Sequence, residues 1–180
     1  MRSKALLPTS LVFVLGALVA AAPAAGAGLA VHRCNGADSG SYRLVFVMNG
    51  DNCSFTGTAD NLIVQAGGTL TLTGAHVSHN LIAWQANAIT VGGGSSVDHN
   101  AVVVGASGTV NVSGSTIGHN ASFQGNRALV VSGDTVGHNV LLIGNSSAQL
   151  STTKVGHDGL CVGTVSGSGN SYGWRNLGCP

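Results

Sequence analysis

A polar pair followed by alternating apolar positions recurs along most of the chain. The pair is first seen as His79-Asn80, and positions one and three after each asparagine are apolar or small, as in Leu81 and Ala83. Such alternation is typical of a β-strand with one buried face. The asparagine column, which an aspartate completes, advances by 19 or 20 residues a step: Asn61, Asn80, Asn100, Asn120, Asn139 and Asp158.

Self-similarity at a fixed period of this length indicates a solenoid, and no repeat contains a helical period. A second strand-like run follows in several repeats, as in residues 109–112 and 128–131. We therefore predict an all-β fold, a right-handed parallel β-helix (β-solenoid) of about six coils of 19–20 residues. Because an asparagine amide can bond to its equivalent on the next coil, we expect the asparagine column to form a structural ladder.

The two ends of the chain lack this repeat. Residues 1–27 have a positive start, a short apolar run and A-x-A cleavage candidates, which predicts a signal peptide and a secreted, extracellular or cell-surface location. We expect an N-terminal cap over 28–49, solenoid repeats over 50–163 and a C-terminal cap over 164–180. No later segment is long and apolar enough to predict a membrane span.

The four cysteines fit the coil period. Cys34 and Cys53 are 19 residues apart, and Cys161 and Cys179 are 18 apart, so each pair is separated by about one coil. Equivalent positions on adjacent coils lie roughly 4.8 Å apart, within disulfide reach. We predict disulfides that staple both ends. A metal site is the alternative, although no C-x-x-C pair is present.

Composition excludes several classes of protein. Hydrophobic residues make up 44% of the chain, which is too apolar for a disordered protein. With 28 glycines and no glutamate, a helical bundle is excluded. Seven Lys and Arg residues cannot build a basic patch, so we predict no nucleic-acid partner.

The strand after each asparagine is apolar on both faces. If positions one and three point inward, the outward set is mostly apolar as well: Ile63, Ile82, Trp84, Val102, Val104, Leu141 and Ile143. An exposed apolar face of six strands exceeds what a soluble monomer usually shows. We expect it to be an interaction face for self-association or for another surface protein. The alternative is that the chain termini fold over it.

Five histidines should stack in a second column, beside the asparagines: His79, His99, His119, His138 and His157. A corner ladder is the simplest interpretation. A metal- or heme-binding strip is the alternative, but a straight column presents ligands from one side only, so we predict no metal and no cofactor. Protonated imidazoles one coil apart would repel by roughly 1 kcal/mol in water, so we expect the fold to be less stable at low pH.

Catalytic motifs are absent from the sequence. The acids are single aspartates on different coils, and the neighbours Asp98 and His99 would point to opposite faces of a strand. We predict no catalytic residues. A Thr-x-Thr array for ice binding occurs on one coil only, at 69–73.

The repeat rhythm, as in residues 60–64, 77–81 and 136–140, resembles that of secreted bacterial parallel β-helix repeat proteins and, distantly, that of the bactofilins. The resemblance covers residues 50–163. It implies a β-helical scaffold with a tendency to assemble end to end or side by side, and no catalytic residues carry over.

Together these features predict a secreted, non-catalytic structural or interaction module. The alternative is a carbohydrate-binding or polysaccharide-cleaving β-helix, with glycan as partner and Trp84 and Trp174 as sugar platforms.

Overall fold

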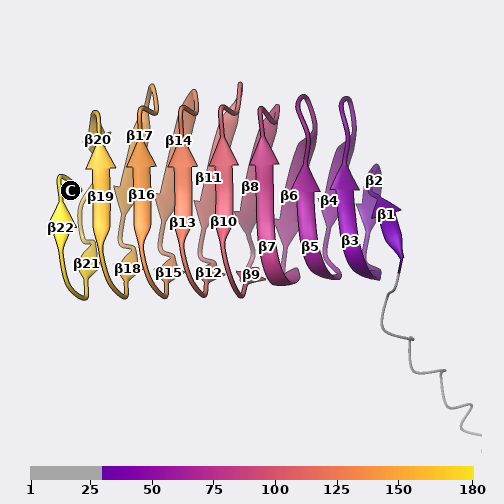
Figure 1. Ribbon diagram of the computed structural model, residues 1–180, viewed down its shortest axis with the longest axis horizontal. Helices are drawn as coiled ribbons and strands as arrows, with labels where there is room; N and C mark the ends of the chain where they lie inside the picture. The colour runs from indigo at the N-terminus through magenta and orange to yellow at the C-terminus, as the bar shows by residue number, and fades with distance from the viewer. Residues whose placement is uncertain (1–29) are drawn as a thin grey trace, which may run out of the picture.

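A computed structural model describes residues 30–180, which wind into a parallel β-solenoid of about seven turns and contain no helix. The chain rises along a front row of strands, crosses at the top and descends behind, and each turn moves toward the C-terminal end (Figure 1). This winding is right-handed, as predicted. The predicted signal peptide, residues 1–27, lies outside the described residues.

Three rows of strands form the walls of the solenoid. The front row comprises β1 (Val31–Arg33), β3 (Ser41–Val47), β5 (Thr58–Val64), β7 (His76–Trp84), β10 (Ala101–Val104), β13 (Ala121–Gln124), β16 (Val140–Ile143), β19 (Gly159–Val162) and β22 (Asn176–Leu177). The back sheet comprises β2 (Gly36–Asp38), β4 (Asn52–Phe55), β6 (Thr69–Thr73), β8 (Ala88–Gly92), β11 (Thr109–Ser113), β14 (Ala128–Ser132), β17 (Ala148–Ser151) and β20 (Val165–Ser166). The short-strand row comprises β9 (Ser96–Val97), β12 (Thr116–Ile117), β15 (Thr135–Val136), β18 (Lys154–Val155) and β21 (Ser171–Tyr172).

Each strand pairs in parallel with the equivalent strand of the next coil, so equivalent residues stack. Ala101 on β10, for example, pairs with Leu81 on β7 and with Ala121 on β13. The front and short-strand rows join into one 14-stranded sheet, because β7 pairs with both β9 and β10. The back strands form a separate eight-stranded sheet.

The core is a stack of apolar side chains inside the coils. The residues one and three positions after each asparagine are buried, as predicted; Leu62, Leu81 and Phe123 are fully enclosed. A second buried column comprises Val77, at the start of β7, and Val97, Ile117, Val136 and Val155 on the short-strand row. Burying a side chain of this size contributes about 1.5–3 kcal/mol, so the stacked columns supply most of the stabilisation.

The coil stacking continues through both segments that we expected to be caps. In the segment 28–49, β1 and β3 pair with the same parallel register as the later front strands. In the segment 164–180, β20, β21 and β22 each pair with a strand of the preceding coil. These additional strands explain why the solenoid has about seven turns rather than six. The sequence pattern missed them because they lack the His-Asn pair.

The predicted disulfides are present. Cys34–Cys53 and Cys161–Cys179 each join two successive coils, with Cα–Cα distances of 5.4 and 4.9 Å. The first lies wholly in the core at the N-terminal end, and the second closes the C-terminal end. No described cysteine is free.

Candidate functional site

The front row presents its apolar side chains to the outside. Ile63, Ile82, Val102 and Leu141 stack as one outward column, and Trp84, Val104 and Ile143 stack as a second. Ile82 and Trp84 are 41% and 58% exposed, and the other five are half-buried between their neighbours. No described segment folds across these strands, and the chain end after β22 lies at the C-terminal end of the solenoid (Figure 1).

The two outward columns extend beyond the residues that the sequence analysis singled out. Phe46, Leu160 and Leu177 continue the first column, and Val162 continues the second. A polar break lies at the middle, where the Gln124 Nε2 donates to Ser122 Oγ at 2.9 Å. We call the surface formed by these two outward columns, from β3 to β22, the front face.

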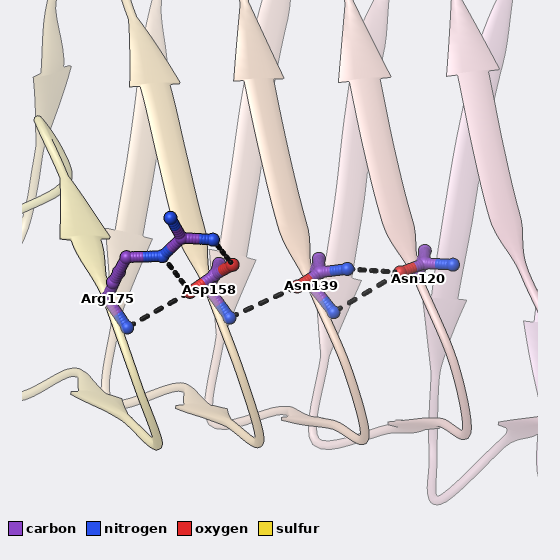
Figure 2. A network of polar contacts seen from close by, with 4 residues as sticks. All are labelled: Asn120, Asn139, Asp158 and Arg175. Carbon is purple, nitrogen blue, oxygen red and sulfur yellow. Dashed lines mark hydrogen bonds and ion pairs between the residues drawn. The ribbon is translucent and has the colours of Figure 1, made fainter.

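The asparagine column forms a hydrogen-bonded ladder at the corner where the front strands begin. Each Oδ1 accepts from the backbone N–H and from the Nδ2 of the next asparagine along the chain, with Nδ2–Oδ1 distances of 3.0–3.3 Å. Figure 2 shows the last members, where Asn139 bonds to Asn120 and the Asp158 N–H donates to Asn139. The side-chain dipoles of the asparagines therefore all point the same way along the solenoid.

An ion pair ends this ladder. Arg175 donates to the Asp158 carboxylate through its backbone N–H, its Nε and a terminal guanidinium nitrogen at 3.0, 3.2 and 2.9 Å (Figure 2). These bonds hold the pKa of Asp158 below its usual range. The same guanidinium lies 4.5 Å from the centre of the Trp174 ring. An aspartate suits this place because it accepts from the last coil and donates no side-chain hydrogen bond.

The five histidines also form a column, which lies on the outside of the corner. All five side chains are exposed, and successive ring centroids are 4.8–5.2 Å apart. His99, His119, His138 and His157 stack nearly in parallel, whereas His79 is tilted by 55° from His99. Trp174, which is 70% exposed, packs edge-on against His157 and completes the column.

A shallow groove borders the C-terminal half of the histidine column. Its volume is about 390 Å³. Asn120, Asn139 and Asp158 form one side, Leu141, Leu160 and Leu177 contribute the apolar part, and Arg175 lies at its end. The groove therefore lies between the asparagine ladder and the first apolar column of the front face.

The structure separates the two tryptophans that were candidate sugar platforms. Trp84 lies on the front face, in the same coil as His79. Trp174 lies five coils further along, at the end of the histidine column. They cannot contact the same short oligosaccharide, because five coils span about 24 Å.

Two buried polar features escaped the sequence analysis. Asn126 and Asn145 form a second, interior ladder, in which Asn126 donates to Asn145 Oδ1 at 3.0 Å. Asp134 is also buried, and its carboxylate accepts from the backbone N–H groups of Ser115 and Ser132 at 2.8 and 3.0 Å. The Gly-Asn pairs at 125–126 and 144–145 were the available signal for the first, whereas Asp134 occupies a position where the two adjacent coils have Ser115 and Thr153.

The side chains that could ligate a metal are spread along the described part of the solenoid. Within the described part of the chain, no three His, Cys, Asp or Glu side chains gather as metal ligands. Nearly parallel imidazoles one coil apart cannot share a zinc ion, which holds each nitrogen at about 2.0–2.1 Å. The pair His76 and Asp98 lies on the short-strand side, with 3.4 Å between nitrogen and oxygen.

No protein-family model, curated protein or solved structure matches this chain. Among residues 30–180, no helix is long and apolar enough to cross a membrane.

Proposed function

We propose that the protein is a secreted, non-catalytic structural module that associates with further copies of itself through the front face. The signal-like residues 1–27 support export, and two disulfides support an oxidising compartment. The solenoid supports a scaffold role, because its repeated coils present an extended, regular surface.

The apolar front face is the observation that carries this proposal. Its two outward columns contain no charged residue from β3 to β22. Eight strands about 4.8 Å apart and four residues of about 3.3 Å each give a flat area of roughly 450 Å². Apart from the polar break at Ser122 and Gln124, this area has the size of the largest apolar patch on a typical soluble monomer, and such patches are often functional.

A second copy of the chain fits this face well. Two uncharged, flat surfaces do not repel, and a two-fold axis would pair the same patch on both copies. The pair would cover roughly 900 Å², which is less than the roughly 1,200–2,000 Å² of a stable interface. We therefore expect association that is weak and concentration-dependent, and that strengthens where many copies are held side by side.

Sedimentation of the mature, oxidised protein at neutral pH tests the proposal. We expect dimers or larger assemblies to form as concentration rises, with ordered assemblies visible by negative-stain electron microscopy. The double variant Ile82→Lys, Trp84→Lys should remain a monomer, because it places two charges on exposed apolar positions of the face.

The matched control places the same charges on the back sheet. The double variant Thr73→Lys, Gln149→Lys changes two exposed back-sheet residues and should associate like the wild type. A wild-type chain that stays monomeric at every accessible concentration, or two double variants that behave alike, would exclude self-association through this face.

Carbohydrate binding is the second candidate function. It is supported by Trp174, which is exposed beside a groove that combines amide, apolar and guanidinium groups. Proteins commonly use such combinations to fix the orientation of a small polar ligand. Binding to any class of glycan on an array would support it, and binding to none would exclude it.

A further inference from the structure

The histidine column is a straight, exposed array of groups that can gain charge. Histidine is the side chain whose unperturbed charge changes between pH 5 and 8. The column sets five of these side chains in a line, at steps of 4.8–5.2 Å. We propose that this column binds a linear acidic polysaccharide, a polyuronate, in mildly acidic conditions. The inference deepens the second candidate function and is independent of self-association.

The spacing of the column favours a polyuronate. An extended chain of uronic acids carries one carboxylate per pyranose ring, and one ring is about as long as one coil step. Duplex nucleic acid instead places its phosphates about 3.4 Å apart along each strand, which does not match the coil step. The solenoid repeat therefore matches a polymer whose charge repeats once per sugar.

A polymer chain can reach the column from outside. Glycine precedes three of the histidines, at Gly118, Gly137 and Gly156, and so no side chain stands beside the rings on that side. The backbone itself requires glycine there, since a Cβ at Gly137 would lie 1.9 Å from the Gly118 carbonyl oxygen. On the other side lies the groove of about 390 Å³, bordered by the residues that directly follow His119, His138 and His157.

The charged groups around the column leave a net positive strip when the imidazoles are protonated. Asp98 precedes His99 and lies near His76, and Asp60 precedes the first member of the asparagine ladder. Asp158 is paired with Arg175. Three carboxylates thus oppose five column histidines, His76 and one arginine. Stacked imidazolium ions repel one another, and a bound polyanion relieves this repulsion, so binding and protonation favour each other.

Trp174 gives the strip a sugar-specific end. Its ring is 70% exposed, lies edge-on to His157 and is backed by Arg175. An exposed aromatic ring can pack against the apolar face of a pyranose, which inorganic polyphosphate lacks. We therefore expect the column to prefer an acidic sugar chain over a chain of phosphates.

Calorimetric titration with an oligogalacturonate long enough to span the five histidines tests this inference. The carboxylates of this probe remain ionised at about pH 5.5 and pH 7.5. We expect binding at the lower pH that weakens at least about tenfold at the higher pH and at raised salt. On the wild-type protein, the histidine ring NMR signals of the column should shift on titration, while those of His32 should not.

Histidine-to-glutamine substitutions inside and outside the column test whether binding depends on the column itself or on any histidine. His119→Gln, His138→Gln should weaken binding at the lower pH at least about tenfold, because it removes two central cations. His32→Gln, which changes a histidine on β1 at the N-terminal end of the solenoid and outside the column, should bind within about twofold of the wild type. Circular dichroism at pH 7.5 verifies that both variants are folded.

Three results would overturn the inference. They are equal affinity at the two pH values, undiminished binding by the column variant, and polyphosphate of matched length binding as tightly as the oligogalacturonate. If the array shows neutral glycans binding while the oligogalacturonate does not bind, carbohydrate binding stands and the acidic specificity fails. None of these outcomes bears on the sedimentation experiment, because that experiment tests association through the front face.

Discussion

At the scale of single residues, Asp134 is an acid inside the solenoid. Burial raises its pKa to about 6, and the two backbone N–H bonds only partly offset this effect. Between about pH 4 and 6 the folded chain therefore binds more protons at this site than the unfolded chain. It follows that the contribution of Asp134 to stability is greatest in acid and is lost as pH rises through this window.

The variant Asp134→Ser should remove this dependence. Serine already occupies the equivalent corner at Ser95, where its Oγ accepts the backbone N–H of Ala75 at 3.2 Å, so it can replace the carboxylate as acceptor. We expect the variant to gain stability relative to the wild type as pH rises from about 4 to 7. Urea unfolding of both chains across this range measures the difference. A difference in unfolding free energy that does not change with pH would contradict the raised pKa of Asp134. The histidine column does not affect this comparison, because both chains contain it.

At the scale of the repeated element, the short turn before His119, His138 and His157 depends on close stacking of backbones. A Cβ on Gly137 or Gly156 would lie 1.9 or 2.0 Å from the carbonyl oxygen one coil away. No side chain fits at such a distance. The backbone therefore sets the distance between coils at this turn, together with the asparagine ladder.

The variant Gly137→Ala should be strongly destabilised, by several kcal/mol, because the coils must separate to admit one methyl group. Gly92→Ala is the matched control, since its Cβ would meet its nearest neighbour at 3.5 Å, an ordinary contact. We expect the control to change stability by less than about 1 kcal/mol. Thermal unfolding followed by circular dichroism compares the two variants, and equal losses would mean that the stacking distance at Gly137 is not limiting.

At the scale of the whole molecule, each coil contacts chiefly its neighbours, so the ends have half the support of the middle. The two disulfides close loops of one coil at these ends. At the N-terminal end, the His32 and Tyr42 rings also stack at 4.1 Å. At the C-terminal end, Asn170 and Tyr172 donate hydrogen bonds to the Pro180 carbonyl oxygen at 3.0 and 3.2 Å. These contacts oppose fraying, to which an open solenoid is prone.

Replacing Cys161 and Cys179 together by alanine should cost about 3 kcal/mol, the value expected for a loop of this length. The loss should begin locally, since the C-terminal coils have partners on one side only. Hydrogen exchange should therefore show faster exchange in β19–β22 at conditions where β10 and β13 remain protected. Uniformly faster exchange along the chain would show that the solenoid unfolds as a single unit.

The sequence alone determined the coil, its register and its disulfides. Five similar steps of 19 or 20 residues place equivalent residues in columns, and in a solenoid a column is also a stack in space. For this reason the inward Leu62 and Leu81, the outward Ile82 and Trp84, and the cysteine pairs could all be assigned in advance. Local periodicity was sufficient because each coil contacts only its neighbours.

Only the tertiary structure decided where the segments without the repeat are placed and how the side chains at the corners are oriented. The strands in 28–49 and 164–180 lack the repeat motif, so their place in the stack depends on pairing with the coil before or after them. The exposure of the histidine rings, the pairing of Arg175 with Asp158 and the burial of Asp134 depend on how the chain bends at the corners. Alternation along a strand fixes the direction of a side chain, whereas at a corner the direction is set by contacts across coils.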